Sequence, residues 1–246
     1  MEVCLADLHV HTALSPCAEA EMTPPAIVEV AAEQGVGLLG ICDHNSAENA
    51  IAVAEAGAAA GVAVLCGIEV QTREDVHVLT FFEDAEALSR WQAEVYEGLP
   101  NVANDEARFG EQVVLDPRGV LKGRVTRLLL ASTSMGIEDV ACRVRELGGL
   151  VIPAHVDRPS FSLIRNLGFV PRRLCPDALE VSARLGASRA REMFPQLAGF
   201  QLVVSSDAHR LSEIRGYTAF RLERPTFSEV KLALASIGGR AAWPVG

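Results

Sequence analysis

The chain has 246 residues, of which 49% are hydrophobic and 5% aromatic, and its formal net charge at pH 7 is −10. This length suits one large α/β domain or two small ones, and the apolar content can fill a sizeable core. The acidic balance and the lack of a Lys/Arg run argue against a protein that coats extended nucleic acid, whereas they are compatible with a pocket for a small anion or a short oligonucleotide.

Strand and helix patterns alternate through the first 97 residues. Short apolar runs predict strands, and longer amphipathic stretches predict the helices between them. Thr23 and the two prolines that follow it mark the start of the first helix. The expected strands are residues 3–8, 38–42, 62–68 and 76–82, and the expected helices are residues 24–34, 47–60 and 85–97.

The regular pattern stops between residues 98 and 130. The tetrapeptides Gly98-Leu-Pro-Asn101 and Asp116-Pro-Arg-Gly119 are turn signals. We interpret residues 98–130 as an insertion after the fourth strand and not as a second domain. The segment is either a long surface loop or a short hairpin that pairs residues 112–115 with residues 120–121.

Alternation resumes after this insertion. Helices are expected at residues 137–147, 187–194 and 226–237, and strands at residues 150–153, 178–181 and 201–204. Thr226, with Glu229 three residues later, forms a capping box for the last helix. About seven strands, mostly followed by helices, predict a single α/β domain over residues 1–246 with a barrel-like or strongly curved sheet.

Six cysteines are spread along the chain without a Cys-x-x-Cys pair, and four of them lie in apolar segments. This usage predicts reduced thiols in a cytoplasmic protein, and the folded pattern begins too close to Met1 for a secretory leader. Residues 50–68 are almost wholly apolar, but Glu55 and three glycines argue against a membrane span.

The six histidines of the chain lie where predicted strands end and loops begin, which is where ligands converge in α/β proteins. They are His9, His11, His44, His77, His155 and His209, and the acidic residues Asp7, Asp43, Glu69 and Asp207 occupy similar places. Side chains alternate along a strand, so the His9-Val-His11 spacing puts both imidazoles on one side. Mixed imidazole and carboxylate ligands suit Zn, Mn or Fe better than Ca or Mg alone. The set exceeds what one ion can use, so we expect two or three divalent ions with a bridging carboxylate.

Five short motifs occur in a distinctive order: Asp7-Leu-His-Val-His-Thr12, Cys42-Asp-His-Asn45, Gly67-Ile-Glu69, Pro153-Ala-His155 and Ser206-Asp-Ala-His209. Each motif is weak alone. The ordered set, which lies between Val3 and Tyr217, resembles the PHP (polymerase and histidinol phosphatase) metallohydrolase family. The resemblance implies a distorted seven-stranded β/α (TIM-like) barrel with up to three metal ions at the carboxyl ends of its strands.

The resemblance also implies ligands by position. One ion would lie among His9, His11, Glu69 and Asp207, a second among Glu69, His77 and His155, and a third on His44, His209 and a loop ligand. The family commonly supplies that loop ligand from an Asp or His seven residues after the first motif histidine, where this chain has Pro16. Cys17 or Glu19 is a candidate substitute, and a thiolate would favour zinc. The alternatives are a weakly bound third ion and a Cys17 that is only a loop residue.

The implied chemistry is attack by a metal-activated water, because a bound ion lowers the pKa of water from about 15.7 toward ~7. The catalytic candidates are His209, His44 and Asp207, the two histidines being placed to assist the leaving group. Asp7, Asp43 and Asn45 are expected to orient the imidazoles. Arg158, Arg210 and Arg215 are the candidates for binding a substrate phosphate through their planar guanidinium groups.

The leading hypothesis is a metal-dependent phosphomonoesterase for a small substrate such as a nucleotide, a sugar phosphate or a histidinol-phosphate-like compound. The alternatives are a 5′-end nucleotidase or exonuclease on short oligonucleotides and a non-catalytic, metal-binding regulatory module, which Pro16 favours. The two lysines, Lys122 and Lys231, are too few for long polymers. Hydrolysis of C–N bonds ranks last, because the lysine bridge expected for it has no counterpart here. No membrane partner is expected, and the oligomeric state stays open.

Overall fold

The structure, a computed structural model, describes residues 1–245. The strands are β1 (Glu2–Val10), β2 (Leu38–Ile41), β3 (Ala63–Gln71), β4 (His77–Phe82), β5 (Val113–Leu115), β6 (Leu121–Arg124), β7 (Leu150–Pro153), β8 (Leu179–Ser182), β9 (Leu202–Ser205), β10 (Thr218–Leu222) and β11 (Ala241–Pro244). The helices are α1 (Pro24–Glu33), α2 (Ala50–Ala60), α3 (Ala85–Gly98), α4 (Glu106–Phe109), α5 (Ile137–Glu146), α6 (Leu163–Leu167), α7 (Ala187–Met193) and α8 (Phe227–Leu234), with the short 3-10 helices η1 (Pro195–Leu197) and η2 (Leu211–Glu213).

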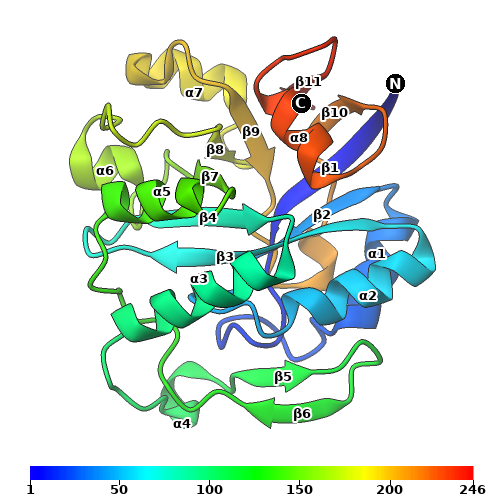
Figure 1. Ribbon diagram of the computed structural model, residues 1–246, viewed down its shortest axis with the longest axis vertical. Coiled ribbons are helices and arrows are strands. Elements are labelled where there is room, and N and C mark those ends of the chain that lie inside the picture. The colour runs from blue at the N-terminus through cyan, green and yellow to red at the C-terminus, as the bar shows by residue number, and fades with distance from the viewer. Residues whose placement is uncertain (246) are drawn as a thin grey trace.

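Seven strands form one curled sheet in the order β11-β10-β1-β2-β3-β4-β7 (Figure 1). Strands β1, β2 and β3 run parallel to one another, whereas β4 is antiparallel to β3 and β7 is antiparallel to β4. Only residues 72–76 join β3 to β4. A parallel crossover needs a dozen residues or more, so this connection has to be a hairpin.

The sheet does not close, so the expected seven-stranded barrel is found only as an open, curled half-barrel of mixed strand direction. Strand β10 pairs antiparallel with β1, β11 pairs antiparallel with β10, and the two strands occupy the side of β1 at which a closing strand would pair. Strands β8 and β9 instead form a separate parallel pair. A single bridge, between Val10 and Ala208, links the end of β1 to the loop after β9. The closed barrel is therefore replaced by two hydrogen-bonded sheets that meet at a seam.

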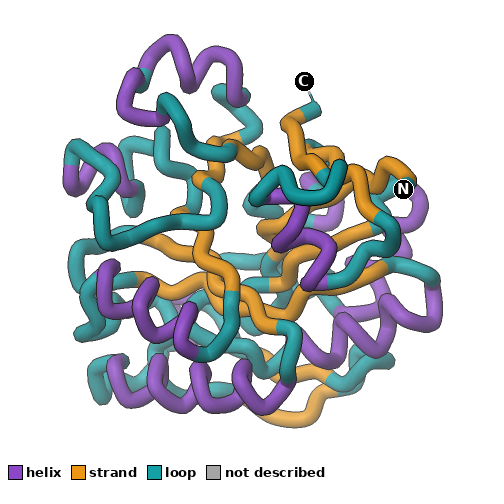
Figure 2. The backbone as a smooth tube through the Cα atoms, turned by 45° about the horizontal axis from the view of Figure 1, so that its top comes forward, coloured by secondary structure: helices purple, strands orange, loops and turns teal. Residues whose placement is uncertain are grey.

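The central strands of the large sheet run through the middle of the molecule, with helices and loops around them (Figure 2), whereas the β5–β6 hairpin lies at the periphery. Helix α3 is anchored to the sheet by Trp91, whose side chain is fully buried. The Trp91 Nε1–H donates to Thr80 Oγ1 at 2.9 Å, and the Thr80 hydroxyl donates to the carbonyl of Ile68 at 2.9 Å. The indole therefore buries its apolar surface without leaving its N–H unpaired.

Residues 98–130 contain α4 and the β5–β6 hairpin, the hairpin being the second of the two forms left open by the sequence. The hairpin packs on the loop between β1 and α1, where the Val113 N–H donates to the carbonyl of Ala13 at 3.2 Å. Gly110 has a φ of +100°, and a Cβ there would lie 2.2 Å from the Pro16 carbonyl oxygen. The segment thus supports, by direct backbone contact, the loop that carries Pro16 and Cys17.

All six cysteines are free thiols. Among the helices of residues 1–245, none is both long enough and apolar enough to cross a membrane.

Candidate metal centre

The six histidines converge at one edge of the sheet because of the strand directions. His9 and His11 lie at the end of β1, and His44 follows β2. His77 begins β4, but β4 is reversed, so its start pairs with Gln71 at the end of β3. Strand β7 is reversed again, which returns its end, and with it His155, to the same edge. His209 reaches this edge from the loop after β9.

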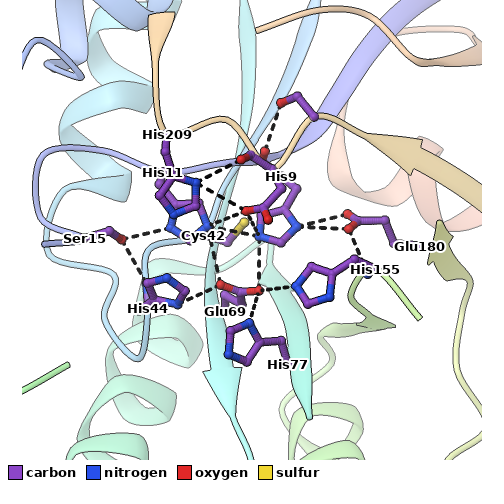
Figure 3. Close-up of polar contacts among 12 residues, drawn as sticks. His9, His11, Ser15, Cys42, His44, Glu69, His77, His155, Glu180 and His209 are labelled. Atoms are coloured by element: carbon purple, nitrogen blue, oxygen red, sulfur yellow. Dashed lines mark hydrogen bonds and ion pairs between the residues drawn. The ribbon is translucent and has the colours of Figure 1, made fainter. Parts of the chain in front are cut away.

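The Glu69 carboxylate lies at the centre of these imidazoles (Figure 3). It is completely buried, and neither of its oxygens has a hydrogen-bond donor within residues 1–245. Its Oε1 lies 2.8 Å from His77 Nδ1, 3.2 Å from His9 Nε2 and 3.4 Å from His155 Nε2, and its Oε2 lies 2.8 Å from His44 Nδ1 and 3.4 Å from His11 Nε2. Burial alone would raise the pKa of Glu69, but the charges of His77, His9 and His44 hold it well below its usual value. An ionised carboxylate buried in this way requires cations around it.

A second close group joins His9, His11 and Asp207. The two Nε2 atoms lie 3.1 Å apart, and Asp207 Oδ1 lies 3.2 Å from His9 Nε2 and 3.1 Å from His11 Nε2. Ligands about 2.0–2.1 Å from a tetrahedral zinc ion lie about 3.3 Å from one another. The separations in this group therefore fit a shared divalent cation.

The partners of the other ring nitrogens fix which nitrogen of His9 and His11 faces this group. His9 Nδ1 donates to the Glu180 carboxylate, with oxygens at 3.1 and 3.2 Å. His11 Nδ1 donates to Ser15 Oγ at 2.9 Å, and Ser15 Oγ in turn donates to Asp43 Oδ1 at 2.7 Å. Both Nε2 atoms are thereby left as acceptors that point at each other, an arrangement that a bound cation resolves.

A third group lies at the open side of the cluster. The ligand atoms of His11, His44 and His209 lie within 4.8 Å of one another. His209 Nδ1 donates to the Asp207 carbonyl at 2.9 Å, and its Nε2 lies 3.1 Å from Cys17 Sγ. Burial would raise the pKa of the Cys17 thiol, but hydrogen bonds with His209 and His44 lower it to about 6.

The loop after β1 places Cys17, and not Glu19, against this third group. Pro16 offers no ligand atom, and the chain turns beyond it so that the next side chain reaches His209. The Glu19 carboxylate is exposed and pairs instead with Arg210 Nε at 3.0 Å. Of the two substitutes considered from the sequence, the structure brings only Cys17 to the cluster.

Two of the residues expected to orient imidazoles contact backbone instead. Asp7 accepts the N–H groups of Ser206 at 3.0 Å and Arg215 at 3.1 Å, and it touches no imidazole ring. Burial raises the pKa of Asp7 to about 6. The Asn45 side chain donates to the carbonyls of Leu129 and Ala131 at 2.8 and 3.0 Å. Asp7 thus ties β1 to the loop after β9, and Asn45 ties the loop after β2 to the end of the insertion.

Asp43 also makes no direct contact with an imidazole ring. Its carboxylate accepts from the Thr12 N–H and hydroxyl, both at 2.7 Å, and from Ser15 Oγ. It therefore influences His11 through Ser15 and not by direct contact.

Of the three arginine candidates for phosphate binding, one lies at the cluster and two are exposed on the surface. Arg158 pairs with Asp207 Oδ2 at the edge of the cluster. Burial alone would lower the pKa of Arg158, but the charge of Asp207 raises it above its usual value, so the side chain stays cationic. Arg210 and Arg215 are both exposed, and the Arg210 side chain turns toward Glu19. Only Arg158 stands at the cluster.

A cleft of about 300 Å³ opens onto the cluster. Its lining includes Cys17, His44, His77, His155, Asp207 and His209 from the cluster and Gln71, Leu130, Arg158, Ser160 and Phe161 around them. The ring of potential ligands is thus accessible to a small molecule from one side.

Sequence reasoning missed Glu180 and Ser15. Glu180 is buried in β8, where its Oε1 also accepts the backbone N–H of His155 at 3.0 Å. The available signal was a single carboxylate inside an otherwise apolar strand, because such a charge is rarely buried without a partner. The role of Ser15 depends on a loop conformation, so no spacing in the sequence indicates it.

Two residues of the cluster have an unusual backbone conformation. His155 and Asp207 have φ values of +30° and +56°. Residues other than glycine are uncommon there, and the strain of such positions collects at functional sites.

A family model described as PHP domain matches residues 7–148, more than half of the chain. The uncharacterized protein YqxK of Bacillus subtilis (strain 168) is 25% identical over 267 residues, a match that covers 95% of this chain and 62% of YqxK. The chain therefore spans less than two thirds of that relative.

Several solved structures share the fold. The lesion-specific endonuclease EndoQ of Pyrococcus furiosus gives a TM-score of 0.75 at 21% identity, over 98% of this chain and 58% of that chain. An Endonuclease Q complex with a 27-mer duplex substrate carrying an abasic lesion gives 0.67 at 20% identity, with the same coverage. A candidate metal-dependent phosphoesterase from Bifidobacterium adolescentis gives 0.56 at 21% identity, over 83% of this chain and 87% of that chain. At these identities the likeness concerns the fold alone.

Proposed function

The chain belongs to the PHP domain family of metal-dependent hydrolases, and from this premise we propose that it hydrolyses a phosphomonoester with water. The observation that carries the proposal is the Glu69 carboxylate, which is buried without a hydrogen-bond donor and has five imidazole nitrogens within 3.4 Å. No apolar core needs such a group, because an ionised carboxylate is buried only where cations surround it.

The residues present fit two or three divalent ions of zinc, manganese or iron. His9, His11 and Asp207 would hold one ion, His77 and His155 a second, and His44, His209 and Cys17 a third, with Glu69 as the bridging carboxylate. Such ions supply Lewis acidity toward a phosphoryl oxygen and lower the pKa of water.

The remaining residues of the cleft position the substrate and its protons. Arg158 lies at the cleft with its charge held by Asp207, so its remaining N–H groups can bind the phosphoryl oxygens of a substrate. His209 donates through Nδ1 to a carbonyl, so its Nε2, beside Cys17 Sγ, is the atom that would either bind the third ion or, when that ion is not bound, hold a proton for the leaving alkoxide. His44 is the alternative proton donor.

The size of the cleft favours a small substrate. A volume of about 300 Å³ is at the lower end of ligand pockets and suits a nucleotide, a sugar phosphate or a histidinol-phosphate-like compound.

A second candidate function, cleavage of a nucleic-acid chain, is favoured by local charge. Residues 158–191 contain seven arginines and two acidic residues, Asp177 and Glu180, in a chain whose net charge is −10. Six of these arginines, all except Arg158, are exposed. These exposed cations, which the net charge conceals, suit contact with a phosphate backbone. The fold it shares with endonuclease Q, whose complex holds duplex DNA, supports the same candidate.

The test is metal analysis of protein purified without added metal, followed by phosphate release from an aryl phosphate, from 5′-mononucleotides and from short oligonucleotides. Release from the small esters that depends on Mn²⁺ or Zn²⁺ and is lost in Glu69→Gln supports the monoesterase. Chain cleavage without release from the small esters supports the nuclease. Full metal occupancy with no hydrolysis of any substrate would favour the non-catalytic module.

A further inference from the structure

Phe161 occupies a conformation that an aromatic residue rarely adopts. It lies in the loop between β7 and α6 with a φ of +53°, and 42% of its surface is exposed. Its ring nevertheless lines the cleft beside the cluster. A left-handed backbone at a bulky residue persists only when surrounding contacts enforce it.

The contacts that enforce this conformation are made by Phe161 itself and by the residue that follows it. Its carbonyl accepts the N–H of His77, the first residue of β4, at 3.0 Å. The next residue, Ser162, donates its hydroxyl to the Arg158 carbonyl at 2.6 Å and caps helix α6 by accepting the N–H of Arg165 at 3.3 Å. The ring is therefore presented by a fixed loop.

The Phe161 ring stacks on a member of the central cluster. Its centroid lies 4.8 Å from that of the His77 imidazole, with the ring planes 17° apart. His77 in turn lies 2.8 Å from Glu69. One face of the phenyl ring is covered by His77, so the exposed surface belongs to the other face and the edge of the ring.

The cleft thus combines a cation with a flat apolar surface. Arg158 lines the same cleft as Phe161, and Leu130 adds a further apolar side chain. Gln71 and Ser160 also line the cleft, but the Gln71 amide already donates to Asp75 and Ser132, so few hydrogen-bonding partners are left for a sugar. A planar aromatic group needs only a π-face, which Phe161 supplies.

We propose that Phe161 is the stacking platform for a nucleobase, so that the phosphate ester turned over in this cleft is a nucleotide or the terminal nucleotide of an oligonucleotide. This inference rests on the proposed function, because it places the nucleotide phosphate at Arg158 and the metal cluster. The strained loop holds the ring in place in advance, so that no ordering of the loop accompanies binding of the base.

The experiment compares purine nucleoside 5′-monophosphate with ribose 5-phosphate, using full-length, metal-loaded protein. For each compound, kcat/KM and the equilibrium Kd are measured in wild type, Phe161→Ala, Phe161→Leu and Phe161→Trp. Stacking of one base predicts that wild type prefers the nucleotide and that Phe161→Ala reduces this preference by about 10-fold. Phe161→Leu is expected to behave like the alanine variant and Phe161→Trp to restore the preference. Phe169→Ala, an exposed phenylalanine outside the cleft, is the matched control.

Metal content is measured in every variant. If Phe161→Ala loses its metal, the role of Phe161 is to shield His77 and not to stack a base. The inference is overturned if wild type binds both compounds equally, or if Phe161→Ala weakens both by the same factor. Should no compound be hydrolysed, the proposed function fails, while the Kd comparison still decides whether a base is stacked.

Discussion

The Glu180 carboxylate accepts a hydrogen bond from the His9 ring, with both of its oxygens within 3.2 Å of Nδ1. The same carboxylate accepts the backbone N–H of His155. One buried acid from the β8–β9 pair therefore orients one candidate ligand and the backbone of another. Such outer contacts fix the tautomer and raise the basicity of the nitrogen that faces a metal.

Glu180→Gln is expected to weaken metal binding by about 10–100-fold without unfolding the protein. An amide can still donate or accept, but it removes the negative charge that stabilises the His9 N–H donor. Metal affinity is measured by competition with a chromophoric chelator, and circular dichroism checks the fold. Glu192→Gln, which changes an exposed carboxylate paired with Arg189 outside the cluster, is the control. Equal affinities in the two variants would refute the role given to Glu180.

Added Zn²⁺ or Mn²⁺ is expected to raise the Tm of the wild-type chain. A ligand present at 100 times its Kd stabilises the folded state by about 2.7 kcal/mol, which is about 5–10 °C for a domain of this size. Glu69→Gln should lose most of this gain, because the bridging charge is gone. Scanning calorimetry with and without a chelator measures both effects. A full metal-induced rise in the variant would contradict the central place of Glu69.

In the metal-free protein, Cys17 is expected to react with iodoacetamide at a lower pH than an ordinary thiol does. Its pKa is lowered to about 6, so the thiolate fraction and the alkylation rate rise as pH increases through that value. Added zinc should protect the thiol. Peptide mapping by mass spectrometry follows Cys17, with the exposed Cys142 as the internal comparison. The prediction fails if zinc leaves Cys17 as reactive as before.

Thr80→Val is expected to destabilise the fold by about 1–3 kcal/mol, because it leaves the buried Trp91 N–H without an acceptor. Chemical denaturation gives the free energy of unfolding. The double variant Thr80→Val with Trp91→Phe removes both partners, and its loss should fall short of the sum of the two single losses. Additive losses would mean that the hydrogen bond contributes nothing.

Much of the fold could be predicted from local pattern. The strands expected near residues 3–8, 38–42 and 62–68 are present because buried parallel strands are continuous apolar runs. The family resemblance drawn from five ordered motifs is confirmed by the family match over residues 7–148. Strands β10 and β11 were not predicted, since Arg221 and Pro244 interrupt their short apolar runs.

Strand direction is what the sequence could not supply. The expectation of ligands at the carboxyl ends of parallel strands does not apply to His77, which begins a strand. The hairpin between β3 and β4 reverses that strand and carries its first residue to the ligand edge. Asp7 and Asn45 were misjudged for a related reason, since adjacency in sequence to an imidazole does not decide whether a side chain meets ring or backbone.

The candidate metal ligands come from both sides of the seam between the two sheets, so a bound ion would connect the sheets. His9 and Glu69 belong to the curled sheet, whereas Asp207 follows the β8–β9 pair, which no continuous ladder joins to that sheet. An ion shared by these side chains would add a cross-link between two sheets that are otherwise joined by a few backbone hydrogen bonds, such as those from Val156 N–H to Glu180 O and from His11 N–H to Ala208 O, at 2.9 and 3.0 Å. Removal of the ion with a chelator should therefore cause β8 and β9 to open locally before the rest of the molecule unfolds. In this fold a bound cation would hold the two sheets together.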